Sequence, residues 1–156
     1  MRKFLMLLVA CALVGIFGSH AQSSYQASLG LGIDFGDDVT FIGPSGKYFF
    51  TENHAGQADL GFEDGATLLT FLYSYHDEFA GAAGLRWYAG AGLSFLFVED
   101  SDTFFALRPH VGLDYKINNV PLAFSFDWRP YFFLNSDVDD RFEAAGFLVG
   151  FRYAFE

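Results

Sequence analysis

Apolar and polar residues alternate with a period of two along most of the chain, and this alternation places successive side chains on opposite faces of a β-strand. The pattern is clear in residues 25–35, 85–97, 105–116, 122–132 and 147–155. One face of these segments carries no charge and holds most of their large rings, whereas the other face is rich in glycine and carries charged residues. No segment competes with a helical period here, so the sequence predicts an all-β chain.

Three weaker strands are expected near residues 41–51, 55–62 and 66–76, which brings the total to eight. Turn-forming residues separate the strands, and nothing indicates a linker or a second domain. Pro109 and Pro130 lie within predicted strands, almost opposite each other, and we predict one shared bulge there. An even number of antiparallel strands of roughly ten residues is typical of a membrane barrel. The predicted fold class is therefore a closed, antiparallel, up-and-down transmembrane β-barrel with eight strands and a polar, filled interior.

The size of the side chains predicts which face points outward. An eight-stranded barrel has an interior only just wide enough for side chains to fill. The rings of Trp87, Phe126, Phe151 and their many neighbours on the same face cannot all fit inside it. This aromatic face must point outward, and a surface that apolar is tolerated only in lipid.

The opposite face then places charged side chains in the barrel interior. Six basic residues are expected there: Lys47, Arg86, Arg108, Lys116, Arg129 and Arg152. Four acidic residues are expected to face them: Asp34, Asp59, Asp114 and Asp127. A buried charge is costly unless it is paired and hydrogen-bonded. We therefore predict a lumen of ion pairs that acts as a plug and not as a pore.

The first residues predict export. The basic pair Arg2 and Lys3 precedes an apolar region, and a cleavage site of small residues ends at Ala21, so residues 1–21 are predicted to be a signal peptide and residues 22–156 the barrel domain. An N-terminal membrane anchor is one alternative.

A second alternative is a lipoprotein signal, because the residues that end at Cys11 resemble the site at which bacterial lipoproteins are acylated. After residue 21 no uninterrupted apolar stretch is long enough for a helical membrane span. The formal charge is −10 for the whole chain, and it becomes −12 once the two basic residues of the signal are removed. Such a protein is not expected to bind nucleic acid, whose phosphates require a basic surface.

The two ends of the barrel are expected to differ. An even strand number puts both termini in the periplasm, so the external loops are residues 36–40, 62–66, 98–103 and 134–144, which hold eleven of the nineteen acidic residues. An aromatic girdle is expected near the periplasmic ends of the strands. Its members are Tyr25, Tyr48, Tyr75, Trp87, Tyr115 and Tyr153.

The chain ends in the aromatic segment Phe-Arg-Tyr-Ala-Phe-Glu at residues 151–156. With this ending, the signal and the two-residue repeat, the chain resembles over residues 22–156 the small OmpA/OmpX-type outer-membrane barrels of Gram-negative bacteria. The segment 112–116, which continues to Pro121, is also similar to segments of uncharacterised barrels of this kind. The resemblance implies the fold, a location in the outer membrane, and recognition of the last strand by the barrel-assembly machinery. The ending departs from the usual pattern because Glu156 follows the final aromatic residue. The family hosts adhesins, anchors, small channels and some lipid-modifying enzymes, so the resemblance does not define a function.

The residues indicate no catalytic site, cofactor or metal centre. His54 and His76 are expected in or beside periplasmic turns, and His110 is expected inside without a nucleophile near it, so we predict a non-enzymatic protein. The acidic segments 99–102 and 137–140 could bind Ca²⁺ or Mg²⁺, or bridge such ions to lipopolysaccharide phosphates, but they lack EF-hand spacing and a solvated rim is favoured.

The function predicted is a structural or surface-interaction role in the outer membrane, with a narrow channel for ions or small solutes as the alternative. The expected partners are outer-membrane lipid, lipopolysaccharide and the assembly machinery, and a monomer is expected.

Overall fold

The computed structural model describes residues 25–135 and 139–155. The predicted signal peptide and Cys11 therefore lie outside the described residues. The strands are β1 (Ala27–Phe35), β2 (Thr40–Phe49), β3 (His54–Glu63), β4 (Ala66–Glu78), β5 (Leu85–Val98), β6 (Phe104–Lys116), β7 (Leu122–Trp128), β8 (Tyr131–Phe133), β9 (Phe142–Glu143) and β10 (Phe147–Phe155). Within the described residues, no helix is long and apolar enough to cross a membrane.

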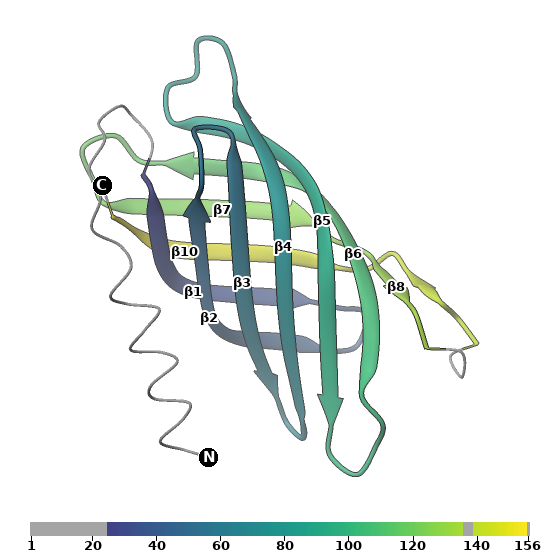
Figure 1. The fold of residues 1–156 in the computed structure, drawn as a ribbon. Coiled ribbons are helices and arrows are strands. Elements are labelled where there is room, and N and C mark those ends of the chain that lie inside the picture. Colours follow the sequence, from purple (N-terminus) through teal and green to yellow (C-terminus); the bar gives the residue numbers. More distant parts are fainter. Residues whose placement is uncertain (1–24, 136–138, 156) are drawn as a thin grey trace.

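The strands close into one antiparallel barrel (Figure 1). Each strand from β1 to β6 pairs with the next one along the chain, and β10 pairs with both β1 and β7. β7 and β8 pair with the same strand, β6, and are two parts of one barrel strand interrupted at residues 129–130. β9 and β10 likewise form one strand. The ten segments therefore make eight barrel strands, which confirms the predicted fold class.

The two prolines lie opposite each other, but the predicted bulge is not between their strands. The pairs Val111 with Trp128 and Leu107 with Phe132 have the same register, so no extra residue separates β6 from β7 and β8. Pairing simply stops at residues 129–130, because a proline has no N–H to donate to the ladder. The extra residue of a bulge lies in the neighbouring barrel strand, between Phe142 and Phe147.

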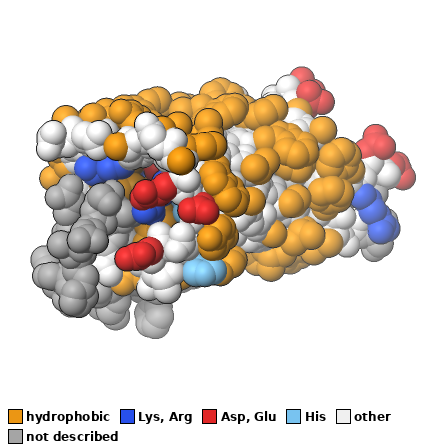
Figure 2. All heavy atoms as spheres, turned by 90° about the horizontal axis from the view of Figure 1, so that it is seen from above, with side chains coloured by type: hydrophobic (Ala, Val, Ile, Leu, Met, Phe, Trp, Pro, Cys, Tyr) orange, Lys and Arg blue, Asp and Glu red, His pale blue; other side chains and the backbone are white. Residues whose placement is uncertain are grey.

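The predicted orientation of the two faces is confirmed. The side chains of Phe126 and Phe151 are about half exposed on the outer wall, whereas Arg108, Arg129 and Asp127 are fully buried. Hydrophobic side chains cover the wall and charged ones gather toward the ends in Figure 2. The outer surface is therefore an apolar band around a charged interior.

Two apolar clusters close the interior, one at each end. We call the end that holds residues 25 and 155 and the turns at 50–53, 79–84 and 117–121 the terminal end. There, Tyr25 and Phe49 pack with three alanines. At the loop end, which holds the opposite connections, Phe41, Leu68, Ala106 and Tyr131 form the second cluster. The volume argument from sequence put the large rings outside and did not anticipate these two inward-facing caps. The expectation that Tyr25 belongs to the outer aromatic girdle is wrong, because its ring is buried in the terminal-end cluster.

Candidate functional site

Eight charged side chains meet in the lumen between the two apolar caps. They are Lys47, Arg108, Arg129 and Arg152 on the basic side, and Asp34, Asp59, Asp114 and Asp127 on the acidic side, and all eight are buried. Six different barrel strands carry them, because inward positions recur at every second residue of each strand. The two signs balance, so attraction between opposite charges offsets part of the cost of removing them from water.

Arg129 is the centre of this network. Its Nε atom and its Nη2 atom both donate to the Asp127 carboxylate, the latter at 2.7 Å, in a bidentate pair. Its Nη1 atom donates to Asp59 Oδ2 at 2.8 Å and lies 3.9 Å from Asp34 Oδ2. One guanidinium therefore joins carboxylates from three separate strands.

A second cluster surrounds Asp114 near the terminal end. Lys47 Nζ and Tyr25 Oη both donate to Asp114 Oδ2 at 2.6 Å. The Lys47 ammonium also lies 4.4 Å from the centre of the Tyr88 ring, and Tyr88 Oη donates to Asp127 Oδ2 at 2.6 Å. Tyr88 thus links this cluster to Arg129 through Asp127, and both tyrosines use the polar ends of otherwise apolar rings.

Arg108 links the network to the loop-end cap. Its Nη2 atom lies 3.3 Å from both carboxylate oxygens of Asp34, and its guanidinium lies 3.5 Å from the centre of the Tyr131 ring. Its Nε atom donates at 3.0 Å to the carbonyl oxygen of Arg129, at the place where β7 and β8 leave the ladder. The proline interruption therefore makes a backbone acceptor available to a buried guanidinium.

Arg152 has no carboxylate within 4.0 Å among the described residues. Its Nε and Nη1 atoms donate to the hydroxyl oxygens of Ser45 and Ser125 at 2.9 and 2.7 Å. Ser45 in turn donates to Asp59, so the Arg152 charge reaches a carboxylate through one hydroxyl. Two of its three nitrogens are satisfied in this way, whereas Nη2 is buried without a hydrogen-bond partner among the described residues.

Two of the six basic residues predicted for the lumen are not part of this network. Arg86 lies at the terminal end, where its Nη2 atom donates to Glu78 Oε1 at 2.9 Å and its guanidinium lies over the Phe49 ring. Lys116 is partly exposed at the same end and donates to the carbonyl oxygen of Ile117. The expected excess of two cations inside is thus wrong, because both face inward only at the rim.

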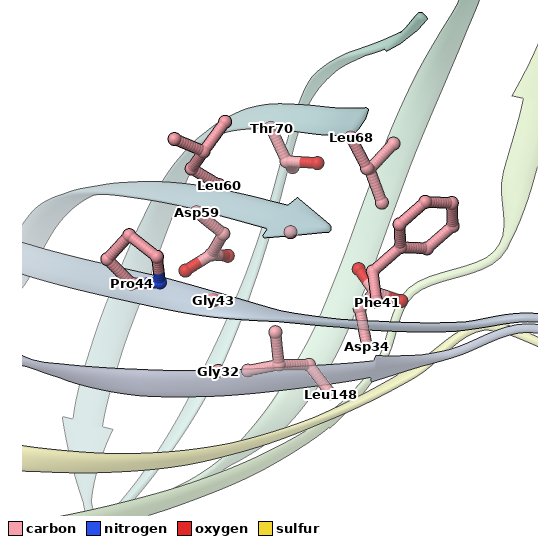
Figure 3. Close-up of a pocket in the computed structure, with 11 residues that line it drawn as sticks. Gly32, Asp34, Phe41, Gly43, Pro44, Asp59, Leu60, Leu68, Thr70 and Leu148 are labelled. Carbon is pink, nitrogen blue, oxygen red and sulfur yellow. The ribbon is translucent and has the colours of Figure 1, made fainter. Parts of the chain in front are cut away.

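One small cavity adjoins the charged network. Figure 3 shows a cavity between β1, β2, β3, β4 and β10, lined by Asp34, Asp59, Thr70 and apolar neighbours such as Leu68. Its volume is about 10 Å³, which is about the room that one water molecule needs. The cavity adjoins the part of the β2–β3 ladder that contains Pro44 and lacks pairing.

The three histidines occupy different surroundings. His54 is partly exposed on the outside and contacts Tyr73, and His110 is buried as expected. His76 is not in a turn but in β4, fully buried, with Nε2 3.0 Å from Ser74 Oγ. The two-residue spacing of Ser74 and His76 could have indicated this contact, because such residues share a face of a strand.

Neither a catalytic triad nor a metal cluster is formed by the described residues. His76 Nδ1 has no hydrogen-bond partner there, so the serine–histidine pair lacks a carboxylate to orient it. No group of three or more histidine, cysteine or acidic side chains in residues 25–135 and 139–155 has the geometry to hold a metal ion. The acids of the loop-end rim are mostly exposed, and Glu143 Oε1 accepts a hydrogen bond from the Asp37 N–H at 3.2 Å.

The fold matches a solved barrel. The crystal structure of the N-terminal β-barrel domain of Pseudomonas aeruginosa OprF is similar with a TM-score of 0.55 and 22% identity, over 83% of this chain and 98% of that domain. At this identity the likeness establishes the fold alone, and it confirms the resemblance to OmpA-type barrels at that level. No protein-family model matches the chain, and no curated protein does either.

Proposed function

We propose that the protein is an integral barrel of the bacterial outer membrane with a structural or surface-interaction role, exported through the signal peptide at residues 1–21. The observation that carries the proposal is the inverted arrangement of the barrel, in which rings such as Phe126 cover the outside while Arg129 and Asp127 are sealed inside. An apolar surface of this extent is stable in hydrocarbon and would aggregate in water. The sequence resemblance to OmpA/OmpX-type barrels supports the same location.

The filled lumen supports a role other than conduction. An ion entering from the terminal end would have to displace the cap formed by Tyr25 and Phe49, then separate Lys47 from Asp114, and finally pass the Arg129 network. Each of these steps breaks charge-assisted hydrogen bonds in a dry interior, where they are strongest. A narrow channel, the alternative, would require a continuous path of water in place of these contacts.

A non-enzymatic role is supported by the burial of the only serine–histidine contact in the described residues. Ser74 and His76 are shielded from solvent, so no substrate reaches them without opening of the barrel. The partners that we propose are the surrounding lipid and lipopolysaccharide, and the assembly machinery, which would recognise the last strand. A monomer fits a closed barrel because closure leaves no strand edge for another copy to pair with.

Two measurements test the proposal. Expressed protein should fractionate with outer membranes and migrate faster on gels when unheated than when boiled, as folded barrels do. In a planar bilayer, the purified barrel should give no steady current. A soluble, heat-insensitive protein would overturn the membrane assignment, and a steady ohmic conductance would support the channel instead.

A further inference from the structure

One carboxylate lies on the outer face of the barrel, at the terminal rim. In the described strands, every Asp, Glu, Lys and Arg except Asp77 occupies an inward position of the two-residue alternation. Asp77 follows Tyr75 on the outer face of β4 and lies directly opposite Trp87 of β5. The strand predicted from sequence ended at residue 76, because an acid on an apolar face indicates the end of a strand. Its outward position therefore needs an explanation.

The surroundings of Asp77 favour a positive charge. Its Oδ1 atom accepts from the Glu78 N–H at 2.8 Å, and no described basic side chain pairs with it. Arg86, a cation at the same rim, donates instead to Glu78 and to the carbonyl oxygen of Glu52. Among the described residues, Asp77 is therefore an exposed acid without a paired cation, and its carboxylate is open to a positive group from outside the chain.

Aromatic rings adjoin the carboxylate on the same face. The ring centres of Tyr75 and Trp87 are 6.0 Å apart, and the imidazole of His54 lies 5.4 Å from the Tyr75 ring. Ring faces attract ammonium groups, most strongly those of tryptophan. The indole N–H of Trp87 has no hydrogen-bond partner among the described residues, and it is free to donate to a phosphate or ester oxygen.

On this basis, and resting on the proposed membrane location, we propose that Asp77, Tyr75 and Trp87 form a binding site for the headgroup of an ethanolamine phospholipid in the adjacent leaflet. The primary ammonium lies between the Asp77 carboxylate and the two rings, and the phosphate accepts the Trp87 indole N–H. A phosphoglycerol lipid has the same phosphate but no ammonium, so the carboxylate repels it. The site therefore selects zwitterionic over anionic phospholipid at the terminal end of the barrel.

The test is a competition between two phospholipids. The full chain and its variants are reconstituted in nanodiscs of equimolar phosphatidylethanolamine and phosphatidylglycerol with the same acyl chains, and the lipids retained on release into mild detergent are counted by native mass spectrometry. The wild type should retain about fivefold more of the ethanolamine lipid, from one exposed ion pair and a cation–π contact. Asp77→Asn should bring the ratio close to one, and Trp87→Leu should lower it.

The matched control is Asp102→Asn, which removes an exposed acid at the opposite end of the barrel and should keep the wild-type ratio. Heat-modifiable migration verifies that each variant is folded. Equal retention of the two lipids by the wild type, or an unchanged preference in Asp77→Asn, would overturn this inference alone. A wild type that failed to insert into bilayers would overturn the proposed function as well.

Discussion

Arg129 offers the sharpest test of the lumen as a set of buried ion pairs. Arg129→Met removes one of four cations and leaves four carboxylates facing three basic groups, with Asp127 losing both of its guanidinium bonds. Breaking a buried pair by removing one partner costs about 3–5 kcal/mol. Asp127 keeps one donor, Tyr88, and Asp59 keeps Ser45 and Gln57, so we expect a loss near the lower end of that range.

The assay is equilibrium unfolding in urea with the barrel reconstituted in phospholipid vesicles, followed by tryptophan emission and by gel migration. The double variant Arg129→Met with Asp127→Asn restores the balance of charge, and it should recover at least about 1–2 kcal/mol of the free energy of unfolding. Arg141→Met, which removes an exposed loop cation, should change it by less than about 0.5 kcal/mol. A cost below about 1 kcal/mol for Arg129→Met, or a double variant no more stable than the single one, would refute the buried-charge reasoning.

Three further predictions concern the wall and its packing. Phe126→Arg should cost about 2–4 kcal/mol in the same unfolding assay, because it places a charge among lipid tails; a cost near zero would put this side chain in water. Gly92→Ala should cost about 1–3 kcal/mol of the free energy of unfolding, because the added Cβ would overlap the carbonyl oxygen of Phe71 on β4. The control Gly46→Ala should change stability little, because the nearest atom to its added Cβ is 3.6 Å away. Equal effects of the two variants would contradict the close approach of β4 and β5. Leu72→Cys should resist a water-soluble maleimide in the folded barrel because Leu72 is buried in the interior, whereas Phe71→Cys on the outer face should react with a lipid-soluble maleimide. Rapid labelling of Leu72→Cys by the water-soluble reagent would reveal an open lumen.

Sequence alternation predicted the strands well because it is a local property of the chain. The strand expected at residues 66–76 is Ala66–Glu78 in the structure, and its last two residues were missed because Asp77 interrupts the apolar face. The size of the rings predicted the orientation of the faces. Both arguments depend only on the two-residue period and on volume, and neither needs to know which strands lie across the lumen from one another.

The partners of the charged residues could not be predicted in this way. Lys47 meets Asp114, 67 residues away in sequence, across the interior of the barrel, and that meeting depends on the stagger of all strands around the barrel. The apolar caps were missed for a related reason. Phe41 lies on the same inward face of β2 as Lys47. Gly61 on the neighbouring strand leaves room for its ring, because a Cβ at Gly61 would lie 2.6 Å from the Phe41 Cβ.

The distribution of charge separates the scaffold from the parts of the molecule that can recognise a partner. The eight charges of the lumen cancel and lie between the apolar caps. In the described strands, Asp77 at the terminal rim is the one Asp, Glu, Lys or Arg on the outer face. The net negative charge of the described chain therefore lies at the two rims, and the loop-end connections carry Arg141 as their single described Lys or Arg. Exposed charges act only over about a Debye length, so a partner attracted by charge must be cationic, or bring a divalent cation, and must approach a rim. A partner that binds the wall has to do so through apolar contact, whereas the proposed Asp77 site at the terminal rim combines such contact with a charge.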